Sequence, residues 1–255
     1  MNKTEGQWIT VHGVHILLES GETKEQAIKR FIENKSQKKD AQIQKSKSEA
    51  DELNNREREK NMQLDAKKYT TELRKQAMEK DKTVTKELQD VVSQGTGELV
   101  GLEYRIKGID SLEEKLFRKA IEKGITVSDY AKKVTDVLRY TNMSKAENLV
   151  NDFNTVVSGL KAKGYEMIEV NNTWKEGSAY KGINILVRDK NGYTFELQFH
   201  TKQSMEIKEI NHKLYEKARK PGTSQAERDR LELEMARNAQ KVITPKNIDQ
   251  IKDKR

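Results

Sequence analysis

The sequence contains no cysteine, only two prolines and no apolar run of about 18 residues, the length that crosses a membrane. The missing cysteines exclude disulfide bonds and thiolate metal sites, although a chain without cysteine can still be exported. The opening residues, MNKTEGQW, also lack the apolar core of a signal peptide. We therefore expect a cytoplasmic protein with no membrane partner.

Apolar residues are scarce for a chain of this length. Hydrophobic residues make up 34% of the 255 positions and charged residues 35%, which is too polar for one compact globule. Part of the chain should therefore be extended or weakly packed. The net charge of +8 suits partners that carry phosphate, but 41 acidic residues are mixed with the basic ones. The charge alone does not favour nucleic acid over nucleotides.

The composition divides the chain into four predicted regions. Residues 1–34 predict a small module, with a β-hairpin in WITVHGVHIL and a helix that starts near Thr23. Residues 35–81 are rich in Lys, Glu, Gln and Asn, without proline or glycine, and predict a charged helical spacer. Residues 82–220 predict the main domain, and residues 221–255 a charged helix and tail.

Strand and helix patterns in the main domain predict an α+β fold, with a mixed β-sheet of about five strands flanked by helices. Strands are expected at 98–107, 135–141, 165–170, 180–188 and 195–201. Helices are expected at about 111–123, 144–164, 204–219 and 224–243. Capping-box patterns begin the second and the last of these helices.

The run FELQFHT and the turn before it predict a sheet face that carries polar side chains. The stretch from Asp189 to Tyr193 fits a three-residue hairpin loop with Gly192 in the left-handed conformation. In that register one face carries Tyr180, Asn184, Glu196, Gln198 and His200, and the opposite face is apolar. A solvent-facing row and a binding surface both fit this arrangement.

A second pattern, R-x-K-x-x-x-S-x-x-x-K, is formed by Arg105, Lys107, Ser111 and Lys115. Ser111 and Lys115 are four residues apart and share one face near a helix N-terminus, where anions are favoured. The cations could converge on a polyphosphate. With 49 basic residues in the chain, however, the same spacing also fits a solvated surface.

Together the two patterns resemble the synthetase domain of the RelA/SpoT family, which transfers pyrophosphate from ATP to the 3′-hydroxyl of a nucleotide. The likeness covers about residues 84–218 and is greatest to toxin-like and secreted nucleotide pyrophosphokinases. It implies Mg²⁺ as cofactor, ATP and an acceptor purine nucleotide as substrates, and (p)ppGpp- or (p)ppApp-like products. No specific nucleic-acid partner is implied.

The resemblance also implies roles for individual residues. ATP would be bound by Arg105, Lys107, Ser111, Lys115 and Arg139. The acceptor would be bound by Tyr180, which stacks on the base, and by Lys181, Asn184, Gln198 and His200. Asp136 and Glu196 would hold Mg²⁺, and Glu196, Arg105 and Lys107 would be catalytic, with Glu196 as a base for the 3′-hydroxyl.

Two positions depart from the family pattern. The family's metal-binding aspartate lies five residues before an arginine, whereas Asp136 precedes Arg139 by three, so a structural role for Asp136 stays open. His200 replaces an arginine of the family, which removes a permanent charge and could change acceptor preference or make activity depend on pH.

Several alternatives stay open. The segment WITVHGVHILLESG is similar to short segments of phage head-morphogenesis proteins and polymorphic toxins, which suggests an effector with an antitoxin partner, or carriage by a phage particle. A catalytically inactive, nucleotide-binding component of a phage or mobile-element particle is the main alternative. Nucleic-acid binding by residues 34–81 is disfavoured by their interleaved acids and scarce aromatic residues. The oligomeric state and the acceptor purine stay open.

Overall fold

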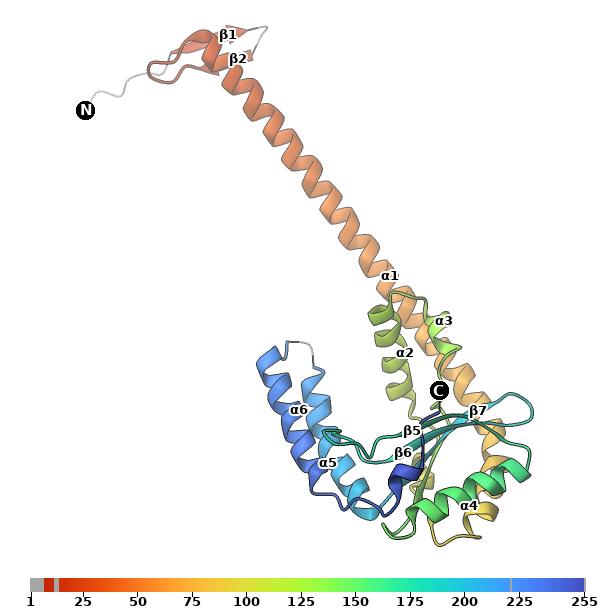
Figure 1. Cartoon of the computed structure of the whole chain (residues 1–255). Coiled ribbons are helices and arrows are strands. Elements are labelled where there is room, and N and C mark those ends of the chain that lie inside the picture. Colours follow the sequence, from red (N-terminus) through yellow and green to blue (C-terminus); the bar gives the residue numbers. More distant parts are fainter. Residues whose placement is uncertain (1–6, 12–13, 221, 255) are drawn as a thin grey trace. The chain divides into compact units, whose positions relative to one another are not determined.

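The computed structural model describes residues 7–11, 14–220 and 222–254. The chain forms two compact units, residues 1–61 and 62–255, which are described separately below (Figure 1). Helix α1 (Lys24–Val92) begins in the first unit and ends in the second. The predicted region boundaries at 34/35 and 81/82 therefore fall inside one continuous helix, and the four regions stay a prediction.

The first unit contains an antiparallel hairpin of β1 (Trp8–Val11) and β2 (Val14–Leu17). Both predicted strands are thus present, while His12 and Gly13 lie outside the described residues. Thr23 and Gln26 form a reciprocal cap at the start of α1, because each backbone N–H donates to the other side chain, at 2.8 and 3.2 Å. Every residue from 32 to 61 is exposed, as expected for a solvated charged helix.

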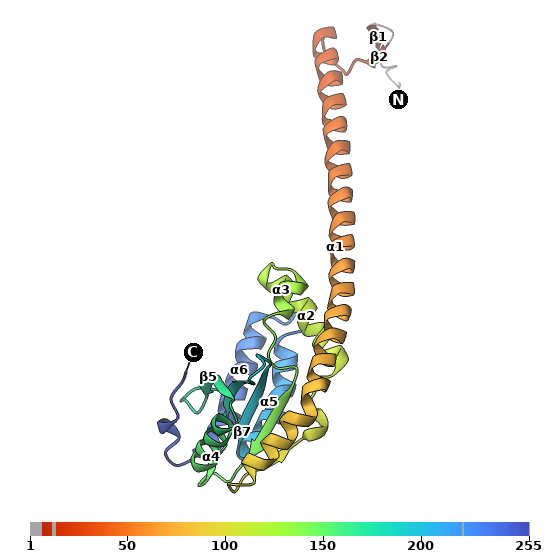
Figure 2. The same ribbon diagram turned by 90° about the vertical axis from the view of Figure 1, so that its right-hand side faces the viewer.

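The second unit is built on a five-stranded sheet in the order β3 (Glu98–Val100), β4 (Arg139–Met143), β7 (Thr194–His200), β6 (Ile183–Arg188) and β5 (Glu166–Asn172). Strands β4 and β7 are parallel and the other neighbours are antiparallel, so the predicted mixed sheet and α+β class are confirmed. The accompanying helices are α2 (Ile109–Lys123), α3 (Val127–Ala131), α4 (Leu149–Ala162), α5 (Lys202–Ala218) and α6 (Gln225–Gln240) (Figure 2). Among the described residues, no helix has the length and hydropathy needed to cross a membrane.

One face of the sheet is the core of the second unit. Phe195, Leu197 and Phe199 of β7 are completely buried there. Phe153 of α4 packs edge-on against Phe199, with ring centroids 5.0 Å apart. The end of α1 covers the same face through Val84, Leu88 and Val91. Each fully buried side chain of this size contributes about 1.5–3 kcal/mol to stability.

Helices α1 and α4 approach each other closely at one glycine. A Cβ atom placed on Gly159 would lie 2.8 Å from a methyl group of Val91. A glycine is therefore needed where α4 crosses the end of α1.

The C-terminal tail belongs to the second unit and covers the outer strand β5. Lys254 forms a backbone bridge with Val170, and the Asn172 side-chain amide donates to the carbonyls of Ile248 and Ile251, at 2.8 and 2.9 Å. The tail thereby satisfies polar groups at an edge that would otherwise be open.

Five predictions about secondary structure were wrong. The helix expected from Ser144 begins at Leu149, and its N-cap, Asn148, makes no side-chain cap hydrogen bond. The strand expected from Tyr180 begins at Ile183. Residues 98–107 do not form one strand, because Gly101 adopts a left-handed conformation with φ 63° and turns the chain into a 3₁₀ turn at Leu102–Tyr104. Pairing resumes only at a single bridge between Ile106 and Leu138. Helix α3 was not predicted, since five residues are too few for a recognisable periodicity. The strand expected from 135 begins at Arg139.

The predicted register of the last hairpin is confirmed. Asn184 pairs with Gln198 and Val187 with Phe195, and Gly192 has a φ of 87°. The backbone N–H of Asp189 donates to the carbonyl of Tyr193 at 2.8 Å, which closes the loop. Because alternate residues point to opposite faces, the polar residues of β6 and β7 lie on the face away from the core.

Candidate active site

The polar face of the sheet is continued by the neighbouring strands. Arg139 of β4 pairs with Glu196 of β7 in parallel register. On the other side, Asn184 of β6 pairs with Asn171 of β5. Arg139 was predicted as an ATP-binding residue, whereas Asn171 was missed because β5 carries no distinctive polar alternation.

A cavity of about 290 Å³ lies over this face. Among the predicted site residues it is lined by Lys115 of α2, Asp136 just before β4, Asn184 of β6 and Glu196 of β7. Further polar lining residues, which were not predicted, are Lys133, Thr135, Glu169 and Asn171. Residues of the R-x-K-x-x-x-S-x-x-x-K pattern and of FELQFHT, about 80 positions apart in the sequence, therefore meet in one cavity.

Asp136 joins two lysines of the cationic pattern. Lys115 Nζ lies 2.6 Å from Oδ1 of Asp136, and Lys107 Nζ lies 3.3 Å from Oδ2. Burial alone would raise the pKa of Asp136, but the two ammonium groups outweigh it and hold the pKa below its ordinary value. Asp136 is therefore ionised, and Lys107 and Lys115 converge on one anion.

Ser111 is exposed in the first turn of α2, one turn before Lys115. Helix α2 begins at Ile109 after Gly108, and no side chain caps its N-terminus. The free backbone N–H groups of this first turn are suited to hydrogen-bond an anion.

Arg105 is engaged elsewhere. Its Nε and Nη2 contact the two carboxylate oxygens of Asp81, in the C-terminal part of α1, at 2.5 and 2.6 Å. The Tyr140 hydroxyl donates to the same carboxylate at 3.0 Å. Arg105 is not among the residues that line the cavity, so its contact with ATP stays a prediction. Asp81 was missed because its sequence surroundings look like the charged spacer.

Residues predicted to bind the acceptor form a hydrogen-bonded group beside the cavity. The Tyr180 hydroxyl donates to Asn184 Oδ1 at 2.8 Å and lies 2.8 Å from His200 Nε2. His200 Nδ1 lies 2.9 Å from the hydroxyl of Ser204. Lys181, by contrast, is not part of this group, because its Nζ donates to the backbone carbonyl of Lys175 at 2.5 Å.

His200 is completely buried and uncharged. Burial, together with the positive charges of Lys208 and Arg139, lowers the pKa of His200 from 6.5 to about 3, against an opposing hydrogen bond from the ring to the backbone of Lys181. The imidazole therefore does not supply the charge of the arginine that stands here in the RelA/SpoT pattern.

Lys208, from the middle of α5, supplies a cation close to His200. Its Nζ donates to Gln198 Oε1 at 2.7 Å and lies 6.0 Å from the ring centroid of Tyr180. Burial and Arg139 lower the pKa of Lys208 to about 8, while Glu196 opposes the shift. Gln198 in turn donates to Glu196 Oε1 at 2.7 Å. One lysine on a polar helix gives no sequence pattern by which its role could have been predicted.

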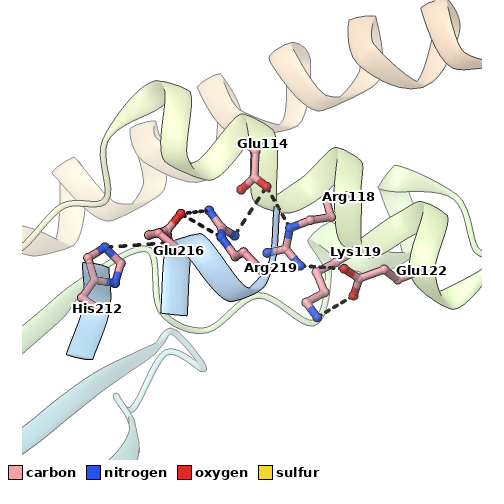
Figure 3. A network of polar contacts seen from close by, with 7 residues as sticks. All are labelled: Glu114, Arg118, Lys119, Glu122, His212, Glu216 and Arg219. Carbon is pink, nitrogen blue, oxygen red and sulfur yellow. Dashed lines mark hydrogen bonds and ion pairs between the residues drawn. The ribbon is translucent and has the colours of Figure 1, made fainter. Parts of the chain in front are cut away.

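Helices α2 and α5 are also joined by one ion pair outside the cavity, within a larger network of polar contacts (Figure 3). Glu114 of α2 contacts Arg118 on its own helix at 2.8 Å and Arg219 at the end of α5 at 3.5 Å. Arg219 also pairs with Glu216 at 2.7 Å. The helix that carries Lys115 is thus tied to the helix that carries Lys208.

Two carboxylates of the cavity could hold a magnesium ion that arrives with a nucleotide, and one of them, Asp136, is already paired with Lys107 and Lys115. Among the described residues there is no group of three or more His, Asp or Glu side chains that could hold a metal. Asp136 and Glu196, however, line the same cavity. Mg²⁺ is commonly held by one or two carboxylates, with waters and substrate phosphates as its remaining ligands.

No protein-family model matches the chain, and no curated protein matches it. Among solved structures it is similar to a GTP pyrophosphokinase family protein from Streptococcus pneumoniae, with 20% identity, 67% of this chain and 87% of that chain covered, and a TM-score of 0.48. It is similar to the type VI effector Tas1, solved in complex with its immunity protein, with 15% identity, coverages of 68% and 95%, and a TM-score of 0.44. It is also similar to small alarmone synthetase 1 from Bacillus subtilis bound to its product pppGpp, with 19% identity, coverages of 57% and 68%, and a TM-score of 0.38. At these identities and TM-scores, no activity is carried over from these proteins to this chain.

Proposed function

We propose that the chain is an ATP-dependent nucleotide 3′-pyrophosphokinase that makes (p)ppGpp- or (p)ppApp-like products. The observation that carries this proposal is the single cavity lined by Lys115 and Asp136 on one side and by Asn184 and Glu196 on the other. It unites cations suited to a polyphosphate with a carboxylate suited to accept a proton, and both motifs resemble the RelA/SpoT synthetase pattern.

The cationic side would bind the triphosphate of ATP. Lys107 and Lys115 already share one anion, the carboxylate of Asp136. The first turn of α2 adds free N–H groups near Ser111. Pyrophosphoryl transfer depends on such preorganised charge because negative charge spreads over the phosphoryl oxygens in the transition state.

The acceptor side would hold a purine nucleotide next to Tyr180 and Asn184. The 3′-hydroxyl oxygen attacks the β-phosphorus of ATP, the bond from that phosphorus to the α–β bridging oxygen breaks, and AMP leaves. Glu196 takes the hydroxyl proton. Mg²⁺, held by Asp136 and Glu196, would neutralise phosphate charge during the transfer.

The decisive experiment incubates the purified chain with labelled ATP, Mg²⁺ and each of GDP, GTP, AMP, ADP and ATP, and then resolves the nucleotides. Labelled pyrophosphate should appear at a 3′ position of at least one acceptor. Glu196→Gln should lower the rate by about 10²–10⁴-fold, the usual contribution of a general base. The control Glu166→Gln, exposed on β5, should keep the rate of the wild type.

Nucleotide binding without any transfer would contradict the proposal and support the inactive, nucleotide-binding particle component instead. The biological setting is a separate proposal. An effector that drains purine nucleotides, with a neutralising antitoxin partner, predicts that expression of the wild type arrests growth and that expression of Glu196→Gln does not.

A further inference from the structure

Three side chains form a chain of hydrogen bonds across the polar face. Lys208 Nζ donates to Gln198 Oε1 at 2.7 Å, and Gln198 Nε2 donates to Glu196 Oε1 at 2.7 Å. An ammonium group can only donate and an ionised carboxylate can only accept. The amide between them therefore has one orientation, with its oxygen toward Lys208 and its nitrogen toward Glu196.

The surroundings make this orientation important. Gln198 is only 4% exposed, so its amide cannot exchange these partners for bulk water at low cost. The charged groups facing Lys208 are Arg139 from β4, Glu196 from β7 and Glu209 from its own helix. Lys208 is also close to the ring of Tyr180, which lies outside this chain of hydrogen bonds.

We propose that Lys208 is a positioning residue that acts through Gln198 on the carboxylate of Glu196. By holding the Gln198 oxygen, it directs the Gln198 N–H group to Glu196 Oε1 and fixes the rotamer of the carboxylate. The second oxygen, Oε2, is then aimed consistently at the acceptor hydroxyl. If Lys208 is removed, the amide can turn over and present its oxygen to Glu196, which repels the carboxylate. This inference rests on the proposed pyrophosphokinase function.

Steady-state kinetics of the full chain separates positioning from binding. Lys208→Met should lower kcat on the order of 10²-fold, the loss typical of a misplaced reacting group, while the KM for the acceptor stays within about threefold. Lys208→Arg, which keeps a cationic donor, should retain most of kcat and serves as the second variant if Lys208→Met does not fold. Lys213→Met, at an exposed lysine on the same helix, is the matched control and should behave as the wild type.

A double-mutant cycle with Gln198→Leu tests whether the effect passes through the amide. If it does, Lys208→Met with Gln198→Leu should be no slower than Gln198→Leu alone. Effects that multiply in the double variant, or a rise in acceptor KM with kcat unchanged, would overturn the proposal, because Lys208 would then act directly on the acceptor.

A readout without turnover distinguishes failure of this inference from failure of the proposed function. If the wild type transfers no pyrophosphate to any acceptor, the proposed function fails. The side-chain ¹⁵N–H₂ signals of Gln198, assigned with Gln198→Leu, then decide on Lys208. They should shift in Lys208→Met and stay in place in Lys213→Met, and unchanged signals in Lys208→Met would overturn the positioning role.

Discussion

His200 shows how burial changes the chemistry of one residue in this site. The imidazole has no exposed surface and contacts the hydroxyls of Tyr180 and Ser204. In the unfolded chain His200 is protonated below about pH 6.5, whereas in the folded chain its pKa is about 3 and it is protonated only below that pH. The neutral imidazole therefore contributes stability that is complete above pH 6.5 and is lost progressively as the pH falls toward 3.

This behaviour predicts a pH-dependent difference between the wild type and His200→Gln. At pH 7 the variant should be the less stable protein, since its amide replaces a well-packed ring. On going to pH 5 the wild type should lose about 2 kcal/mol more than the variant, at about 1.4 kcal/mol per pH unit below the unfolded pKa. Urea unfolding at pH 7, 6 and 5 measures the difference, and parallel stability curves would show that His200 is protonated in the folded chain.

Asp81 and Arg105 show why single residues can be hard to assign from sequence. The R-x-K-x-x-x-S-x-x-x-K spacing identified Arg105, but the carboxylate that holds it lies 24 positions earlier in a helix that reads as a charged spacer. The hydrogen bond from Arg105 is the largest of several contacts that keep the pKa of Asp81 below its ordinary value. Such long-range pairing depends on the final fold and leaves no local pattern.

At the scale of elements, the hairpin of β6 and β7 was predictable because its turn fixes its register. Gly192 supplies the left-handed residue, and the alternation of FELQFHT then assigns each side chain to a face. Residues 98–107 were misread because alternation continues past Gly101, where the backbone already turns. Local chemistry thus predicted the polar face but not the path of the chain after Gly101, which brings Lys107 to Asp136 and Arg105 to Asp81.

The ion pair between α2 and α5 allows a test at the same scale. Glu114 and Arg219 are 46% and 30% exposed and 3.5 Å apart, so their pair should contribute no more than about 1 kcal/mol. A double-mutant cycle of Glu114→Gln and Arg219→Gln, measured by urea unfolding, should give a coupling of this size in low salt. The coupling should decrease in 1 M salt, where the Debye length is about 3 Å. An equally large coupling at both salt concentrations would contradict a screened surface pair.

At the scale of the whole molecule, helix α1 has two environments along its length. Residues 32–61 are exposed throughout, so their removal should cost the second unit almost none of its buried apolar surface. The last turns differ, because Val84, Leu88 and Val91 are 0–2% exposed within the core. The sequence of α1 predicted a helix. Because that sequence has no strong apolar periodicity, it did not predict at which residue the helix begins to pack against the core.

Two truncations follow from this division. A fragment of residues 62–255 should fold with the urea midpoint of the full chain and keep the same transfer rate. A fragment of residues 93–255 loses Val84, Leu88 and Val91 from the core, worth about 5–9 kcal/mol at about 1.5–3 kcal/mol each. That loss is comparable to the total stability of a typical domain, about 5–15 kcal/mol, so the shorter fragment should be unfolded. Circular dichroism and urea titration measure both outcomes, and a stable, cooperatively folding 93–255 fragment would show that α1 is dispensable for the sheet.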